Sequence, residues 1–217
     1  MPERLYKPIC KDLIEHEKKC HFCAKNMTSL KAYKLKHKET GEIVCAGPSC
    51  TEKNIDQGIK LSAIPDLTKY TQPLGGNGGG GGGGNSEKPI IRAEEDKRKA
   101  MEYLELREKK FEKYHSVSYS VLKNYYNKSQ NEELNESEIR HILNIENKTD
   151  ERYKLANLQR CYNYLFWIDV ALDKLEEHNN FLKSIKTYII SNFKITPKQK
   201  DAVNNWLKNI KGVPQIK

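Results

Sequence analysis

The chain has 217 residues, of which 37% are hydrophobic and 31% charged, proportions typical of a globular protein with one large domain or two small ones. Its net charge is +9 at pH 7, and no run of about 18 apolar residues is present that would span a membrane. The first residues, Met1–Tyr6, lack the apolar segment of a signal peptide. Together with the cysteine content, which favours a reducing compartment, this predicts a cytoplasmic protein of a cell or of an infected cell.

Four of the six cysteines lie in two close pairs near the start of the chain. Cys20 and Cys23 have two residues between them, and Cys45 and Cys50, with four residues between them, begin 22 residues after the first pair. Two thiolates at the first spacing hold one ion from a tight turn, and a second pair completes a tetrahedron, which is the ligand pattern of structural Zn²⁺. Buried thiols and two disulfides are the alternatives. We therefore predict one structural zinc ion bound by all four cysteines.

Around these cysteines the sequence predicts a small α+β module over residues 1–72. In chain order we expect a helix of one or two turns at 11–19, a metal-binding turn at 20–23, strands at 32–38 and 43–45 joined by a turn at 39–42, and a short helix at 49–57 with Cys50 in its first turn. This is the order of parts in a treble-clef zinc finger. Because so small a core needs its metal, metal binding and folding are expected to be one event.

Three short elements of this module resemble a known family. They are Cys20-x-x-Cys23, the run from Tyr33 to Ile43 with its Glu-Thr-Gly-Glu turn, and Gly47-x-x-Cys50. Taken together, these three elements are similar to a small treble-clef zinc-finger domain of phage and mobile-element proteins, over about 35 residues. The resemblance implies metal roles for Cys20, Cys23 and Cys50 and a module associated with nucleic acid. Pro48 and the additional Cys45 depart from the family pattern, so Cys45 rests on spacing alone, and His21 or His37 is the alternative fourth ligand.

A glycine run, Gly78–Gly84, divides the chain. Glycine buries no side chain and loses the most entropy on ordering, so we predict a flexible linker over residues 73–88, although so pure a run is also typical of an engineered joint. Residues 89–217 then favour an all-α helical bundle with a basic C-terminal hairpin, which makes the whole fold mainly α. Two modules that move semi-independently follow from this division.

The helical module shows four helical segments in its pattern. An apolar helical stripe under a charged face covers 87–127, and a capping box at 135–138 opens a short helix. Asp150 caps a long apolar helix that we expect at the centre of the bundle. Within that helix Asp169 is expected to face outward or to pair with a basic neighbour. The last helix begins at Thr196-Pro197, with Gln199 closing a second capping box, and its apolar face is predicted to hold Val203, Trp206, Leu207 and Ile210.

Positive charge is concentrated at the C-terminal end. Residues 183–217 hold eight lysines and one aspartate, a net charge of +7, which is a footprint that polyanions can use. A second set of lysines alternates along the predicted strand 32–38. We therefore predict nucleic-acid contacts at two groups of lysines: Lys34, Lys36 and Lys38 on the zinc module, and Lys198, Lys208 and Lys211 on the last helix and the turn after it.

Motifs of enzymes are missing from the sequence. The glycine run lacks the Lys-Ser/Thr of a phosphate-binding loop, and neither His-Glu-x-x-His nor Gly-x-Ser-x-Gly occurs. We predict a non-enzymatic nucleic-acid-binding accessory protein with no membrane contact, phage-encoded if the resemblance holds. The alternative is a protein-interaction factor that docks on a host or viral enzyme, such as a polymerase or nuclease, within a replication, repair or transcription assembly.

Overall fold

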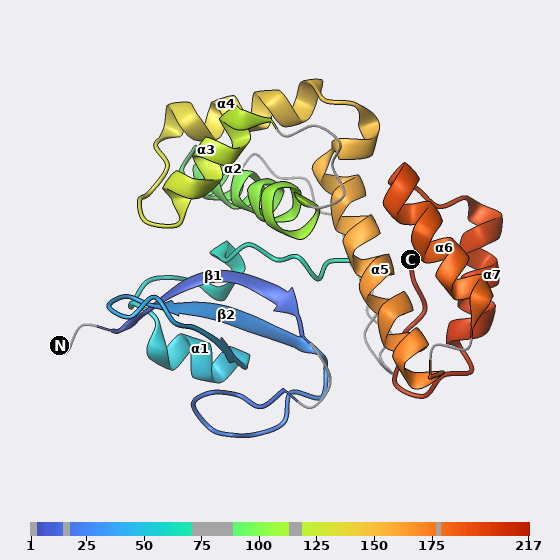
Figure 1. Cartoon of the computed structure of the whole chain (residues 1–217). Coiled ribbons are helices and arrows are strands. Elements are labelled where there is room, and N and C mark those ends of the chain that lie inside the picture. Colours follow the sequence, from blue (N-terminus) through green and yellow to red (C-terminus); the bar gives the residue numbers. More distant parts are fainter. Residues whose placement is uncertain (1–3, 15–17, 71–88, 113–118, 177–178) are drawn as a thin grey trace. The chain divides into compact units, whose positions relative to one another are not determined.

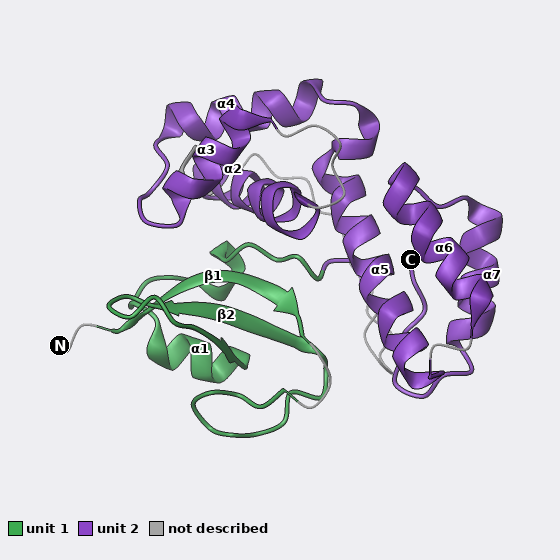
Figure 2. Ribbon diagram, in the orientation of Figure 1, with its two compact units in different colours: residues 1–68 green, residues 69–217 purple. Residues whose placement is uncertain are grey.

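The structure is a computed structural model that describes residues 4–14, 18–70, 89–112, 119–176 and 179–217. Within these ranges the fold is mainly helical, as the sequence predicts, and it contains one three-stranded antiparallel sheet (Figure 1). The chain forms two compact units, residues 1–68 and residues 69–217 (Figure 2). The predicted linker, 73–88, falls within residues 71–88, which lie outside the described residues.

Three strands form the sheet of the first unit, in the order β1-β2-β3. They are β1 (Tyr6–Leu13), β2 (Lys31–His37) and β3 (Ile43–Ala46). The predicted hairpin is confirmed, because β2 and β3 pair antiparallel and the turn between them contains Gly41 at a φ of +73°. The prediction of a helix at residues 11–19 is wrong for residues 11–13, which pair with β2 in the edge strand β1, and residues 15–17 of this segment lie outside the described residues.

The core of the first unit lies on one face of this sheet. Alternate residues of β2 and β3 point toward it, and the predicted short helix, α1 (Pro48–Asn54), follows β3 directly. A single turn of 3₁₀ helix, η1 (Leu61–Ala63), comes later in the chain. The buried members of the cluster are Cys20, Tyr33, Leu35, Val44, Ala46, Ile55 and Ile64. A core of this size is small for independent stability, and one of its members is a cysteine of the candidate metal site.

The second unit begins with a helical region that changes its winding. It consists of α2 (Pro89–Leu104), a π-helical segment η2 (Glu105–Lys110) and α3 (Ser120–Ser129), and residues 113–118 lie outside the described residues. The sequence pattern predicts a helical stripe with an exposed charged face over residues 87–127. The structure departs from that pattern, because Phe111 N donates to Leu106 O at 2.9 Å as the π-helical segment ends.

A long central helix organises the remaining elements. Helix α5 (Leu155–Lys174) has 11 of its 20 residues buried and packs against α2, η2 and α6 (Asn180–Asn192), which confirms the prediction of a central helix. Asp150 caps the short 3₁₀ helix η4 (Glu151–Tyr153) before α5 rather than α5 itself, since Asp150 accepts a hydrogen bond from Arg152 N at 2.9 Å. In the part of the chain that the structure describes, no helix combines the length and the apolar character needed to cross a membrane.

Both predicted capping boxes are confirmed. In α4 (Glu136–Lys148), Glu138 N donates to the Asn135 side chain at 3.0 Å, and Asn135 N donates to the Glu138 carboxylate at 2.9 Å. In α7 (Pro197–Leu207), Thr196 and Gln199 exchange the same pair of bonds at 3.2 and 2.9 Å. These local signals fix where both helices begin.

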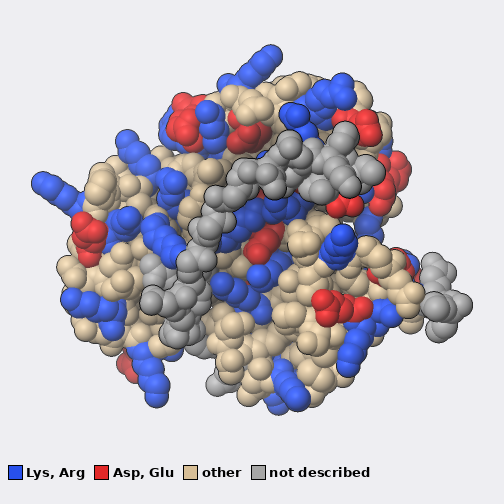
Figure 3. All heavy atoms as spheres, turned by 180° about the vertical axis from the view of Figure 1, so that it is seen from behind, with Lys and Arg blue, Asp and Glu red and all other residues tan. Residues whose placement is uncertain are grey.

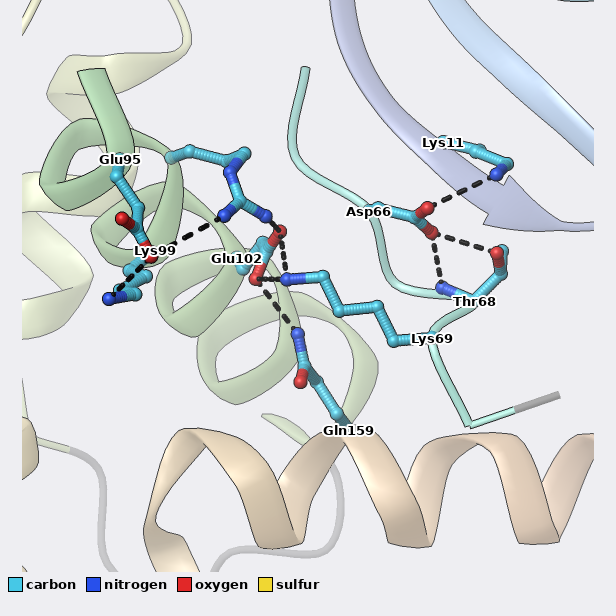
Figure 4. A network of polar contacts seen from close by, with 9 residues as sticks. Lys11, Asp66, Thr68, Lys69, Glu95, Lys99, Glu102 and Gln159 are labelled. Atoms are coloured by element: carbon cyan, nitrogen blue, oxygen red, sulfur yellow. Dashed lines mark hydrogen bonds and ion pairs between the residues drawn. The ribbon is translucent and has the colours of Figure 1, made fainter. Parts of the chain in front are cut away.

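A fully buried carboxylate, Glu102 of α2, collects polar contacts in the second unit (Figure 4). It accepts hydrogen bonds from Lys69 Nζ at 2.7 Å and from Gln159 Nε2 of α5 at 2.8 Å. Arg98, one turn earlier on α2, adds a third bond at 3.1 Å. Three donors around one buried carboxylate compensate its lost hydration, so the helical pattern that places Glu102 on an exposed charged face is wrong.

Candidate metal centre and candidate nucleic-acid interface

The metal-binding turn predicted at residues 20–23 is a closed loop between β1 and β2. Cys20 N donates to Lys25 O and Ala24 N donates to Cys20 O, both at 2.9 Å, and Ala24 adopts a left-handed φ of 55°. His21 N donates to Cys45 O at 2.9 Å, which ties the turn to β3. The backbone therefore presents Cys20 and Cys23 from a turn that is fixed at both ends.

Helix α1 brings a third cysteine to this turn. Gly47 stands at its N-cap and Pro48 at its first position, so Cys50 lies in the first turn of the helix, as the sequence predicts. The Sγ atoms of Cys20, Cys23 and Cys50 all lie within 4.8 Å of one another. Cys20 and Cys23 share one turn, and Cys50 follows them by 30 and 27 residues. The three thiols thus form a group that a single metal ion can bind.

The pKa values of the Cys20 and Cys50 thiols are shifted in opposite directions. Burial raises the pKa of the Cys20 thiol, but backbone hydrogen bonds from Gly47, Cys23 and Phe22 outweigh it, so the pKa is lowered to about 7. Hydrogen bonds to Cys23 and Cys20 raise the pKa of the Cys50 thiol to about 11. Without a metal, one thiolate is thus favoured at Cys20 while Cys50 keeps its proton. A bound cation favours the thiolate form of all three.

Cys45, the fourth predicted ligand, is not brought into this group. Its neighbours Val44 and Ala46 point into the core, so Cys45 points to the opposite face of the sheet, where it is paired in register with Lys34. Burial raises the pKa of its thiol, and the charge of Lys34 opposes that effect. The spacing of cysteines in the sequence does not show on which face of a strand a residue lies, so it could not reveal this.

The two alternative ligands, His21 and His37, also lie outside the group. The Nε2 atom of His21 is 3.4 Å from the Tyr6 hydroxyl. The Nδ1 atom of His37 accepts hydrogen bonds from Glu39 N at 3.3 Å and Thr40 N at 3.2 Å, which employs it in the β2–β3 turn. Among the described residues the metal-ligating group therefore has three members, all of them sulfur donors. Such a donor set suits a thiophilic ion, and it does not suit Mg²⁺ or Ca²⁺.

The predicted lysine surface of the first unit is largely committed to ion pairs. Lys34 Nζ lies 2.6 Å from the carboxylate of Asp12, which is fully buried, and Lys38 Nζ lies 3.1 Å from Asp56. Lys36 is half-buried on β2. The expectation that this strand face is an open row of lysines is therefore wrong for Lys34, which neutralises a buried charge.

The C-terminal lysines are arranged differently. Lys198, Lys208 and Lys211 are exposed, and within the described residues none of them forms an ion pair with a carboxylate. Lys208 Nζ donates instead to the Asn205 side chain at 3.1 Å. Lysine and arginine side chains are spread over the face drawn in Figure 3, with acidic side chains among them, so charge alone marks no single patch on that face. The two predicted lysine groups differ in their ion pairs: Lys34 and Lys38 pair with carboxylates, whereas the three C-terminal lysines pair with none of the carboxylates that the structure describes.

The last helix also differs from its predicted face. Val203 and Leu207 are fully buried, as expected, but Trp206 is 46% exposed. The prediction that Trp206 shares their buried face is wrong, because it lies about 100° from Leu207 around the helix axis and falls at the border of the apolar stripe. An exposed indole thus stands on the same helix as Lys198.

One open cleft lies between α5 and α6. Its volume is about 530 Å³, and its lining includes Asp169, Asp173, Lys183 and Lys186. Asp169 is half exposed and lies 2.6 Å from Lys186 Nζ, so it both faces outward and pairs with a basic neighbour. Because side chains of both charges line this cleft, its lining favours neither an anionic nor a cationic ligand.

Comparison with protein-family models, with curated proteins and with solved structures finds no match for this chain. The resemblance to a treble-clef zinc finger, which rests on the elements around Cys20, Cys23 and Cys50, stays a prediction.

Proposed function

We propose that this chain is a non-enzymatic nucleic-acid-binding accessory protein, in which a structural zinc ion holds the first unit together and C-terminal lysines bind phosphate. The observation that carries the proposal is the exposure of Lys198, Lys208 and Lys211 without acidic partners among the described residues. Ammonium groups without a carboxylate partner in the described part of the chain, within a segment of net charge +7, attract a polyanion, since each phosphate contact releases a condensed counterion. Lys34 and Lys38 contribute less, because carboxylates already neutralise them.

Zinc is the metal that we propose for the three-cysteine group. The donors are thiolates presented by a tight turn and a helix start, which is a common arrangement in structural zinc sites. Cys20 is also a member of the seven-residue core, so the ion would hold the turn, the hairpin and α1 against one another. A structural ion of this kind supplies folding free energy and takes no part in chemistry.

Salt dependence of binding tests the phosphate contacts. A variant with Lys198, Lys208 and Lys211 changed to Gln is compared with a control in which three ion-paired lysines of the second unit are changed to Gln: Lys97, Lys99 and Lys123. Both variants lose three positive charges. If each C-terminal lysine meets a phosphate of duplex DNA, the slope of log K against log salt falls by about 2.7 in the first variant only. Equal slopes in the two variants, or undetectable binding by the wild type at low salt, would contradict the proposal.

Metal content and chelation test the zinc centre. We expect one zinc per chain by elemental analysis, and we expect chelation to unfold residues 1–68 while the helical unit keeps its far-UV signal. Cys23→Ser should act like chelation, whereas Cys45→Ser, the matched control, should leave the zinc content unchanged. Protein isolated without metal, or with a disulfide within the three-cysteine group, contradicts this part of the proposal.

The second candidate is a protein-interaction factor that docks on another protein. It is favoured by Ile43, an apolar side chain that is 49% exposed on the edge strand β3. Ile43→Lys separates the two candidates. The change should leave nucleic-acid affinity intact, and it should abolish capture of a partner that binds at this edge.

A further inference from the structure

Helix α7 carries an indole that the fold leaves in contact with solvent. Trp206 is 46% exposed, although Val203 and Leu207 on either side of it in the sequence are fully buried. Val203 and Leu207 anchor the helix, so a large part of the indole surface of Trp206 is not used in packing. A large π-face is therefore available on the surface of the second unit.

The surroundings of this indole on α7 are not acidic. Ala202, one turn earlier, shares its helix face, and Asn209, in the turn after α7, donates its backbone N–H to Trp206 O at 3.2 Å. Asp201, the acidic residue of this segment, lies about 140° away around the helix axis, and Lys198 lies about 80° away. Asp201, the acidic residue of α7, therefore lies on another face than the indole, and Lys198 lies about two turns away from it along the helix axis.

We propose that Trp206 is a base-stacking platform for single-stranded nucleic acid, with the lysines of residues 183–217 holding the backbone phosphates. This inference rests on the proposed function, and it adds the class of nucleic acid that is bound. Bases in a duplex are already stacked on one another and show only their edges in the grooves, so an indole on a helix surface cannot stack on them. Unpaired bases of a single strand offer their faces, and aromatic side chains bind them without sequence preference.

Charge decides between this ligand and a protein partner. An exposed aromatic side chain suits either, but residues 183–217 carry eight lysines against one aspartate. A groove of positive charge with an aromatic side chain at its edge is the common design of single-strand binding surfaces. The other occupant, an acidic protein surface, becomes an outcome of the test.

The protein carries its own reporter for this contact. Its two tryptophans are Trp206 and Trp167, and Trp167 is 1% exposed within α5. A base stacked on Trp206 quenches the emission of the exposed indole and leaves that of the buried one unchanged. In Trp206→Phe, whose emission comes from Trp167 alone, the same ligand should cause no quenching.

Affinity for oligo(dT) and for duplex DNA of equal length is then measured at one salt concentration with three substitutions: Trp206→Ala, Trp206→Leu and Trp206→Phe. We expect Trp206→Ala and Trp206→Leu to weaken oligo(dT) binding about 5- to 150-fold, the range for the loss of one stacked base, while Trp206→Phe retains most of it. Duplex affinity, which the lysines supply, should stay within about twofold of the wild type. Tyr119→Ala, which removes an aromatic side chain that is 41% exposed at the N-cap of α3, is the control and should change neither affinity.

The outcomes distinguish this inference from the function on which it rests. Wild-type binding of both ligands with no effect of Trp206→Ala overturns the stacking role and leaves the phosphate contacts in place. Wild-type protein that binds neither ligand overturns the proposed function itself. If Trp206→Leu retains the oligo(dT) affinity that Trp206→Ala loses, an apolar contact replaces stacking, the inference is refuted, and a protein occupant is favoured. Far-UV spectra and the emission of Trp167 show that each variant is folded.

Discussion

The ion pair between Lys34 and Asp12 should dominate the response of the first unit to mutation. In Lys34→Met, the carboxylate of Asp12 loses the ammonium group that lies 2.6 Å away, and this carboxylate is fully buried. The Asp12 carboxylate also accepts a hydrogen bond from Leu13 N at 2.9 Å. A buried charge that loses its partner is strongly destabilising because the desolvation of the carboxylate is no longer compensated.

The size of the effect follows from burial. Breaking a buried pair costs about 3–5 kcal/mol, and since the Lys34 side chain is 24% exposed, water reaches one end of the pair and the lower value, about 3 kcal/mol, is expected. A unit of 68 residues has a total unfolding free energy of about 3–10 kcal/mol. Lys34→Met should therefore remove a large share of it. The double variant with Asp12→Asn, which leaves no buried charge, should recover more than half of the loss.

Native-state hydrogen exchange of the amides of β2 measures this loss. Tryptophan fluorescence is unsuitable, because both tryptophans lie in the second unit. Lys25→Met, at an exposed position in the loop before β2, removes the same charge and should change the exchange free energy by less than about 0.5 kcal/mol. A loss below about 1 kcal/mol in Lys34→Met, or a double variant as unstable as the single one, would refute the reasoning.

Three further predictions follow from individual side chains. In metal-free protein, an alkylating reagent at pH 7.5 should modify the exposed Cys23 rapidly, whereas Cys161, whose pKa burial raises to about 12, should react only in denaturant, as mass spectrometry will show. Thr196→Ala should destabilise the second unit by about 1 kcal/mol in urea denaturation, and Thr196→Ser should not, because serine keeps the cap. Burial raises the pKa of Asp66, but hydrogen bonds from Thr68 outweigh this effect and hold the pKa below 3.8. Because the pKa of Asp66 is lower in the folded than in the unfolded protein, its carboxylate stabilises the fold above about pH 3.8, and this stabilisation is lost as pH falls through the folded pKa. Asp66→Asn should make acid denaturation of the first unit less dependent on pH in that range.

Elements with local signals could be predicted from the sequence. The hairpin of β2 and β3 has a strict alternation and a turn that contains Gly41, and α7 begins with a capping box and a proline at its first position. Each signal is contained within a few residues, so no knowledge of the rest of the fold is needed. The closeness of Cys20, Cys23 and Cys50 also followed from spacing, because a tight turn and a helix start hold these residues in fixed geometry.

Features that depend on distant partners could not be predicted in this way. Strand β1 is irregular between Pro8 and Cys10, where its pairing with β2 shifts, and this irregularity hides the alternation that marks a strand. The burial of Glu102 depends on Lys69 and Gln159, which lie far from it in the sequence. The position of Cys45 depends on strand parity, which a spacing rule for metal ligands does not contain.

The way in which α6 ends limits how far the basic hairpin can be separated from the rest of the protein. Phe193 closes the helix in a left-handed conformation, with a φ of 49°, which costs a residue with a side chain about 1–2 kcal/mol. The rings of Phe111 and Tyr153 lie 5.3 and 5.4 Å from its ring, and Asn157 Nδ2 donates to its carbonyl at 2.7 Å. All three partners come from elements earlier in the chain than α6. The backbone conformation at the end of α6 is thus stabilised from outside residues 180–217, so grafting these residues onto another scaffold would transfer their charge without their shape.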